Sequence, residues 1–447
     1  MSAIVLIDAN NFYASCEAVV DPAVIGRPLV VLSNNDGCIV SRSAEARALG
    51  IPMGAPYFQM CRELERHAVI VRSSNYGLYA DMSQRLMATL ESWMEELEIY
   101  SIDEAFGRLQ RPGTTHTTRT SNAGTSTTAG DLRSWGLALR RTVLRHLGLP
   151  VAVGIAPSKV LAKIANRIAK RDPTWGGVFD LGALDDPTPW LEEIAVEDIW
   201  GVGLQWSRWC HLRGISNARI LRDLPPGELR RRWGVVGLRL QRELQGHSCL
   251  PLVALPPPRQ ETCVSRSFSR PVTTLAELRE AVATYLSRAA EKLRRQRQRA
   301  GALTVFVRSN PFDGSRFYAN AATAPLLLPS NDTAVLLAAG LPLAERLFRP
   351  HKSLQKAGVL LQQLQPEKLL QHHLLVPQTA EQQQRREALM AVIDDLNRRY
   401  GSGTLQWAAC GLQPTWIMRR SRVSRAATTR LSDVPVVQAV APRIGSS

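Results

Sequence analysis

Residues 3–20, AIVLIDANNFYASCEAVV, decide how the fold begins. AIVLID is typical of a buried strand, and NNFYASCEAVV after it predicts a helix. A strand pair is predicted over residues 97–109, LEIYSIDEAFGRL, with Asp103 and Glu104 near its turn. Because desolvating a carboxylate is costly, two acids inside an apolar run predict a positive partner close by.

The chain of 447 residues is too long for one core, so several domains are expected. No apolar run reaches the roughly 18 residues of a membrane span, and the N-terminus lacks the features of a signal peptide. We therefore expect a cytoplasmic protein with no membrane partner. The seven cysteines are scattered, with no CxxC pair, which argues against a disulfide framework or a zinc site.

The net charge is +16, the pI is about 10.1, and most of the basic residues are arginine. Arginine binds phosphate through a bidentate fork, so the charge favours a nucleic-acid partner. A basic enzyme without such a partner, encoded by an arginine-rich genome, remains the alternative.

Strands and helices alternate over the first 170 or so residues. PLVVLS and CIVS are predicted to form a hairpin, because the NNDG between them tolerates positive φ. Residues 111–130 are rich in Thr, Ser and Gly and predict a surface loop or an insertion.

Residues 176–246 predict a small helical domain. Within it Gly201 and Gly203 flank one valine in the pattern of a helix-hairpin-helix, whose backbone N–H groups can bind a DNA phosphate. A plain turn between two helices is the alternative interpretation.

After a proline-rich linker, the order βαββαβ predicts a four-stranded sheet with both helices on one face. The free face or an edge could follow a DNA backbone, with Arg266, Arg270 and Arg308 as its contacts. Residues 377–447 look like a tail with one polar helix and no evident core.

Asp8 ends a hydrophobic strand, which is where open α/β sheets place functional groups. Together with Asp103 and Glu104 it could hold one or two hard cations, as in displacement at phosphorus. Lys159 and Lys163 share one helix face, and Ser41 and Arg47 follow the hairpin, which suggests a phosphate pocket. Taken singly, each of these residues has an ordinary structural explanation.

Three segments resemble signature motifs of the Y-family translesion DNA polymerases, and above all of their UmuC-type members. They are DANNFYASCE (8–17), YSIDEAF (100–106) and VGIAPSKVLAKIAN (153–166). The resemblance implies an α+β, multidomain right-hand polymerase with a βαββαβ little finger. The implied domains are a palm (1–175) with inserted fingers (about 20–75), a helical thumb (176–246), a linker (247–260), the little finger (261–376) and the tail (377–447).

The resemblance also implies roles for single residues. Asp8 and Asp103 would bind two Mg²⁺ ions, with Glu104 at the ion of the primer 3′-hydroxyl and the Ala9 carbonyl at the other. Tyr13 would be the steric gate against a ribonucleotide, with Phe12 beside it. The triphosphate of the dNTP substrate would be held by Ser41, Arg47 and Lys163.

The implied function is error-prone, DNA-dependent DNA synthesis across lesions in the SOS response. The implied partners are primer-template DNA, a processed UmuD dimer and the recombinase filament. Sliding-clamp binding stays open, because Gln371–Leu375 lacks the aromatic residue of the family's clamp-binding segment. A catalytically silent, DNA-bound scaffold is the alternative. A related transferase or cyclase acting on free nucleotides would not need the basic second half.

Overall fold

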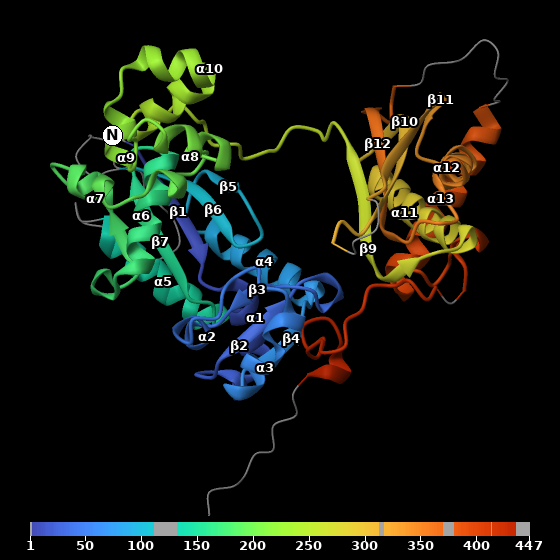
Figure 1. The fold of residues 1–447 in the computed structure, drawn as a ribbon, viewed down its shortest axis with the longest axis horizontal. Coiled ribbons are helices and arrows are strands. Elements are labelled where there is room, and N and C mark those ends of the chain that lie inside the picture. The colour runs from blue at the N-terminus through green and yellow to red at the C-terminus, as the bar shows by residue number, and fades with distance from the viewer. Residues whose placement is uncertain (1, 111–131, 313–316, 370–379, 413, 435–447) are drawn as a thin grey trace, which may run out of the picture. The chain divides into compact units, whose positions relative to one another are not determined.

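The computed structural model describes residues 2–110, 132–312, 317–369, 380–412 and 414–434 (Figure 1). The chain divides into two compact units. The first contains Met1–Ser33, Cys38–Pro256 and Arg422–Ser447, and the second contains Asn34–Gly37 and Pro257–Ser421. The loop predicted at residues 111–130 and the segment Gln371–Leu375 lie outside the described residues.

A five-stranded sheet in the order β5-β6-β1-β7-β8 is the centre of the first unit. Its strands are β1 (Ser2–Ala9), β5 (Leu97–Ile99), β6 (Glu104–Gln110), β7 (Val151–Ala156) and β8 (Val178–Asp180). The middle strand, β1, is antiparallel to both of its neighbours, β6 and β7. The predicted first strand and the strand pair around the two acids are both confirmed.

Both faces of β1 are buried, and its side chains alternate between two cores. Ala3, Val5 and Ile7 pack with α1 (Phe12–Val20), α4 (Tyr76–Glu91) and α5 (Leu132–Leu147). Ile4 and Leu6 pack on the opposite face with α6 (Lys159–Arg171) and helices further along the chain. The continuous apolar run of β1 therefore comes from a strand that has no solvent-exposed face.

Helix α6 lies unusually close to β7, because Gly154 leaves room for its backbone. A Cβ at this glycine would lie 2.2 Å from the Asn166 backbone nitrogen and 2.3 Å from the Ala162 carbonyl oxygen. The Asn166 side chain donates to the Ala152 carbonyl at 2.9 Å. The position of α6 over the sheet is thus fixed at a backbone-to-backbone contact.

A smaller sheet in the order β3-β2-β4 stands beside α1. It consists of β2 (Leu29–Leu32), β3 (Ile39–Arg42) and β4 (Ile70–Ser73), packed with α2 (Ala44–Ala48) and α3 (Tyr57–Arg66). The predicted hairpin is confirmed, and its turn has positive φ at Asn35 (60°) and Asp36 (51°).

The predicted helical segment contains α7 (Thr188–Glu192), α8 (Leu204–His211), α9 (Ala218–Asp223) and α10 (Pro226–Leu244). The element directly before the turn at Gly201 and Gly203 is the short 3₁₀ helix Val196–Asp198, so the turn joins a 3₁₀ helix to α8 rather than one α-helix to another. Residues 178–180, which were expected within the helical segment, form β8 and pair with β7.

The second unit has the predicted order β9 (Thr262–Val272), α11 (Leu275–Arg295), β10 (Gln298–Ser309), β11 (Ala319–Ser330), α12 (Thr333–Leu347), β12 (Leu354–Pro366). Its antiparallel sheet has the order β11-β10-β12-β9, and α11 and α12 share one hydrophobic core with it.

The expectation that the tail contributes no core is wrong. Helix α13 (Ala380–Tyr400) buries Met390, and Cys410 and Trp416 are buried as well, the last two within the core of the second unit. No helix among the described residues is long and apolar enough to cross a membrane.

We predict that Gly154→Ala lowers the unfolding midpoint of the first unit. The added methyl meets backbone atoms that cannot move aside, and overpacking of this kind costs about 1–3 kcal/mol. The measurement is urea unfolding of the full chain, followed by circular dichroism. Gly227→Ala is the matched control, because its Cβ would have no neighbour within 4 Å. Equal stability of the two variants would contradict the close approach of α6.

Candidate active site

Three carboxylates meet at one end of the central sheet. Asp8 on β1 stands directly opposite Glu104, the first residue of β6. Asp103 precedes Glu104, and its carbonyl accepts a hydrogen bond from the Ala9 backbone N–H at 2.9 Å. The Ser101 hydroxyl donates to Asp103 Oδ1 at 2.7 Å, which fixes that side chain. Strand register thus places acids together that lie 95 residues apart in the sequence.

The positive partners of these acids come from one helix. Lys163 Nζ lies 2.9 and 3.1 Å from the two Glu104 oxygens, and Lys170 Nζ lies 2.5 Å from Asp8 Oδ1. The two lysines are seven residues apart on α6 and so share a face. The Lys163 ammonium also lies 4.6 Å from the centre of the Tyr100 ring. Glu104 and Asp8 therefore face α6.

At this end of the sheet the ionised form of Asp8 is unfavourable. Burial raises the pKa of Asp8 to about 7, and the adjacent Glu104 carboxylate adds to the rise. The Lys170 ammonium acts in the opposite direction but does not overcome burial. Asp8 is therefore held in a place where its ionised form needs more positive charge than one lysine supplies.

The carboxylate oxygens of Asp8, Asp103 and Glu104 are the kind of ligand that a hard divalent cation such as Mg²⁺ prefers. No group of three His, Cys, Asp or Glu side chains in the described parts of the chain gathers closely enough to hold a metal. In this arrangement the lysines neutralise the acids instead. The raised pKa of Asp8 and the adjacent carboxylates fit a cation in that place.

Lys159, expected to share a phosphate-facing surface with Lys163, has a different role. Its side chain is buried, with Nζ at 2.5 Å from Glu98 Oε2 and 2.8 Å from the Pro251 carbonyl oxygen. The spacing of four residues along a helix predicted that the two lysines share a face. It could not predict that Glu98 and Pro251, from distant parts of the same chain, would cover the Lys159 ammonium group. The phosphate-facing interpretation for Lys159 is wrong.

Tyr13 is held against an aromatic wall next to the acids. Its ring stacks on Tyr79 with centroids 4.3 Å apart and meets Tyr76 edge-on at 6.2 Å. Burial raises the pKa of Tyr13, and the charge of Asp103 contributes, which places the phenol near that acid. Phe12 is buried in the core beside it.

Ser41 and Arg47 converge on Asn11, the residue before α1. Ser41 Oγ accepts from the Ala14 N–H at 3.2 Å and donates to the Asn11 carbonyl at 3.3 Å. The Arg47 guanidinium donates to Asn11 Oδ1 at 2.6 Å. Asn11 itself has positive φ (49°), which is a strained backbone conformation. Ser41 on β3 and Arg47 on α2 therefore stabilise the start of α1.

Comparison with known proteins agrees with this geometry. Residues 7–167 match the impB/mucB/samB family model, residues 259–374 match its C-terminal domain, and residues 387–437 match a domain of unknown function, DUF4113. The chain is 41% identical over 434 residues to Protein UmuC of Salmonella typhimurium, covering 96% of this chain and 98% of that one. It is 38% identical to Protein MucB of Escherichia coli, with coverage of 96% and 98%.

The chain belongs to the impB/mucB/samB family. It is a DNA-directed DNA polymerase of the Y family, of the translesion type. The fold is that of a Y-family DNA polymerase chimera, Dbh-Dpo4(243-245)-Dbh, with a TM-score of 0.60 at 20% identity, covering 81% of this chain and 99% of the chimera. The post-insertion binary complex of Dbh DNA polymerase gives a TM-score of 0.51 at 20% identity, with coverage of 81% and 99%.

Sequence reasoning missed Lys170 and Ser101. Lys170 lies one heptad after Lys163, and that spacing on an amphipathic helix could have revealed it. Ser101 lies inside the YSIDEAF stretch, two residues before Asp103, where a serine can cap a turn. Lys170 pairs with Asp8, and Ser101 donates to Asp103.

The structure separates the three arginines proposed for DNA. Arg308 lies opposite Lys356, on the sheet face away from the core residues Val305 and Val307. Arg266 shares its side of β9 with the core residues and lies near the helices, where its charge affects Tyr285 and Lys292. Arg270 is ion-paired with Glu277 and hydrogen-bonded to Thr415. Lys356, not recognised from the sequence, joins Arg308 on the open face.

Gly201 has φ of 98°, and Gly203 precedes α8 without a side-chain cap. A Cβ at Gly203 would meet nothing within 4 Å, so no side chain crowds this position. The first N–H groups of a helix have no acceptor within it, which makes the start of α8 a candidate for binding an anion.

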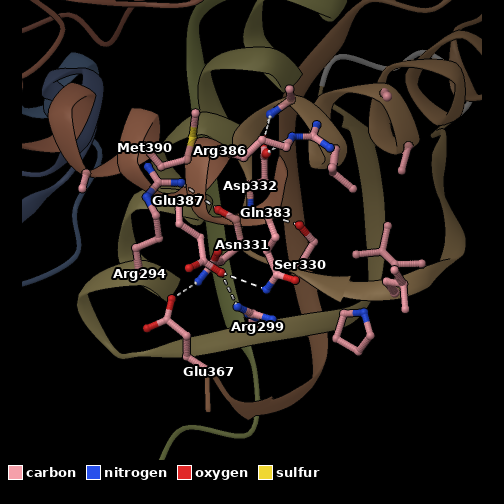
Figure 2. Close-up of a pocket in the computed structure, with 18 of the residues that line it drawn as sticks. Arg294, Arg299, Ser330, Asn331, Asp332, Glu367, Gln383, Arg386, Glu387 and Met390 are labelled. Carbon is pink, nitrogen blue, oxygen red and sulfur yellow. Dashed lines mark hydrogen bonds and ion pairs between the residues drawn. The ribbon is translucent and has the colours of Figure 1, made fainter. Parts of the chain in front are cut away.

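A pocket of about 830 Å³ lies in the second unit, under α13 (Figure 2). Ion pairs cross it from Arg294 to Asp394 at 2.7 Å and from Arg299 to Glu387 at 2.6 Å. None of the acids or lysines described above lines it. It results from the way a charged helix docks on the sheet and is separate from the candidate active site.

We predict that Asp8→Asn stabilises the metal-free protein at pH 8. The folded-state pKa of about 7 lies above the ordinary value of 3.8, so the contribution of Asp8 to stability falls as the pH rises from about 4 to 7. Removing the charge should recover up to about 4 kcal/mol at pH 8, and less as the pH falls toward 5. Urea unfolding of the wild type and the variant in EDTA, at pH 8 and at pH 5, measures the two differences in stability.

Glu96→Gln is the control, because Glu96 is an exposed acid paired with Arg108. Added Mg²⁺ should stabilise the wild type at pH 8 more than the Asp8→Asn variant. A loss of stability in Asp8→Asn at pH 8 would refute this account of the site.

Proposed function

We propose that this polymerase carries out error-prone synthesis past lesions, in the cytoplasm, as part of the SOS response, by two-metal nucleotidyl transfer. The observation that carries the proposal is the set of Asp8, Asp103 and Glu104 at neighbouring strand ends, two of which, Asp8 and Glu104, are paired with lysines of α6. A structural ion-pair network would not need three adjacent acids.

The carboxylates would bind the metal ions, and the basic residues would bind the triphosphate. Asp8 and Asp103 would bind both Mg²⁺ ions, Glu104 the ion at the primer hydroxyl, and the Ala9 carbonyl the ion at the triphosphate. The ions would stabilise the entering and leaving oxygens. With Glu104 engaged, Lys163 would be free to hold a triphosphate oxygen together with Arg47.

Selection of the nucleotide would depend on the start of α1 and on the hairpin sheet. Tyr13, held by Tyr79, would exclude a 2′-hydroxyl, while Phe12 anchors the helix and Ser41 fixes its first turn. The small residues of Cys38–Ser41 would cover the nascent base pair loosely, which tolerates damaged bases at the expense of fidelity.

Primer-template DNA would contact both units. The backbone at Gly201 and Gly203 would bind a phosphate, and Arg308 and Lys356 would lie along the duplex. By resemblance, a processed UmuD dimer and the recombinase filament are further partners, and the sliding clamp remains open.

We expect wild-type protein to extend a primer on undamaged and abasic templates with dNTPs and Mg²⁺. Asp103→Asn should reduce kcat by at least about a hundredfold, because it removes an ionised metal ligand while keeping the shape. Primer extension with a processed UmuD partner present or absent measures this. Glu96→Gln should behave as the wild type. Equal DNA binding by wild type and Asp103→Asn, with no extension by either, would instead favour the scaffold function.

We predict that Arg308→Ala and Lys356→Ala each weaken primer-template binding and lower the slope of log K against log salt by about 1. Fluorescence anisotropy at several salt concentrations measures the slope. Arg270→Ala is the matched control, because Glu277 already holds that guanidinium. A larger slope change for Arg270→Ala than for the other two would contradict the assignment of the open face.

A further inference from the structure

Three aromatic rings lie against the ammonium group of Lys163. Its Nζ is 4.6 Å from the centre of the Tyr100 ring, 5.5 Å from that of Trp200 and 5.9 Å from that of Phe106. A cation within about 6 Å of a ring centre is attracted by the quadrupole of the ring. We call these three residues the aromatic cluster. One ammonium that meets three ring systems is a more specific arrangement than a lysine that lies over a single ring.

The rings of the aromatic cluster also hold one another. The Tyr100 ring meets Trp200 edge-on, with centroids 5.6 Å apart and an angle of 89° between the rings, and meets Phe106 at 5.6 Å. Phe106 and Trp200 are 5.9 Å apart. Trp200 Nε1 donates a hydrogen bond to the Tyr100 hydroxyl oxygen at 3.1 Å. Because Phe106 is fully buried, these mutual contacts anchor the other two rings to the core and fix the surface that the ammonium meets.

The aromatic cluster joins two parts of the first unit. Tyr100 and Phe106 come from the stretch YSIDEAF, which also carries the acids. Phe106 lies two residues after Glu104 and therefore on the same face of β6. Trp200 comes from the helical segment and directly precedes the turn at Gly201. The ammonium from α6 thus contacts the acidic strand pair and the helical segment at the same time.

A lysine needs such support if it is to bind a phosphate at one fixed place, because its charge sits on a flexible four-carbon stem. The Lys163 side chain is 18% exposed, and its ion-pair partner is Glu104. If the Glu104 oxygens bind a metal ion, as proposed above, that ion pair no longer holds the ammonium. The rings carry no charge, so their attraction for the ammonium persists when the carboxylate is engaged elsewhere.

We propose that Tyr100 and Trp200 are positioning residues that hold the Lys163 ammonium where the triphosphate of the incoming nucleotide binds. The inference rests on the proposed triphosphate role of Lys163. The alternative is that the two rings only pack the helical segment on the sheet. Loss of packing would lower the fraction of folded protein, whereas loss of a ring face beside the ammonium would lower the affinity for the nucleotide. The two interpretations therefore predict different measurements.

The test measures the Kd of the matching dNTP by fluorescence titration of the full chain with Mg²⁺ and a primer-template. The primer ends in a dideoxynucleotide, so binding is measured without chemistry. Trp200→Leu and Tyr100→Leu should each raise this Kd by about threefold to tenfold, the effect of losing one cation–π contact. Trp200→Phe keeps a ring face and should stay within about twofold of the wild type.

Trp190→Leu is the matched control. Trp190 and Trp200 are both partly buried tryptophans packed against the same core, and Trp190 meets the Phe179 ring at 4.9 Å. Its replacement removes similar packing but no ring of the aromatic cluster, so the Kd of the dNTP should stay at the wild-type value. An equal rise in Kd for Trp190→Leu and Trp200→Leu would indicate a merely structural role and would overturn the inference.

Lys163→Met separates the aromatic cluster from the proposed function. If Lys163→Met raises the Kd of the dNTP and the two leucine variants do not, the role of the cluster is overturned and the triphosphate role of Lys163 stands. If Lys163→Met leaves the Kd unchanged, the triphosphate role fails and this inference fails with it. A fall in kcat on an extendable primer at an unchanged Kd, in Trp200→Leu and Tyr100→Leu, would indicate fewer folded molecules and would also overturn the inference.

Non-additivity is the positive signature. Trp200→Leu should raise the Kd no further in the Lys163→Met background, because both changes act through one ammonium group. A full further rise there would mean that Trp200 affects the nucleotide by another route, and would overturn the inference. Should Trp200→Leu fail to fold, Tyr100→Leu decides the question, since Tyr100 is 42% exposed and its replacement leaves the core intact. An unchanged Kd in Tyr100→Leu would overturn the inference.

Discussion

The crowding of Asp8, Asp103 and Glu104 at the end of a sheet buried on both faces is the constraint on which the first unit depends. Register alone brings Asp8 opposite Glu104, and burial then makes the ionised form of Asp8 unfavourable. Positive charge must come from an element that can approach closely. Helix α6 supplies it, because Gly154 lets its backbone lie against β7. One glycine in a strand thus determines where Lys163 and Lys170 stand relative to the acids.

The sequence contained the local parts of this arrangement. The strand and helix of residues 3–20, the acidic turn and the βαββαβ order follow from apolar patterns and turn residues, and the structure confirms them. What distinguishes Lys159 from Lys163 does not follow from spacing. Glu98 and the Pro251 carbonyl cover Lys159, and they come from distant parts of the chain. Periodicity predicts which face a residue shares, but not what covers that face.

The arginines of the second unit show the same limit. Counting basic residues correctly showed that the second unit is rich in arginine. The count could not show which arginines lie on which face of the sheet. Alternation assigns Arg308 to the open face only once the register with β12 is known, and that register also reveals Lys356. Arg270 is engaged by Glu277, in the first turn of the following helix. A net charge of +16 therefore overstates how many cations are free to meet DNA.

Two buried carboxylate sites in the first unit solve the same problem in opposite ways. Asp8 and Glu104 are matched by ammonium groups, an arrangement that a divalent ion can replace. Glu17 accepts a hydrogen bond from the Tyr79 hydroxyl at 2.7 Å, and that donor fixes a ring rather than attracts a ligand. A charged pair tolerates exchange of its cation, whereas a directional hydrogen bond to a fully buried oxygen specifies one geometry. The first kind of site is suited to chemistry that loads and releases ions. The second is suited to keeping the Tyr79 ring in one position beneath Tyr13, the residue proposed to distinguish nucleotides by their sugar.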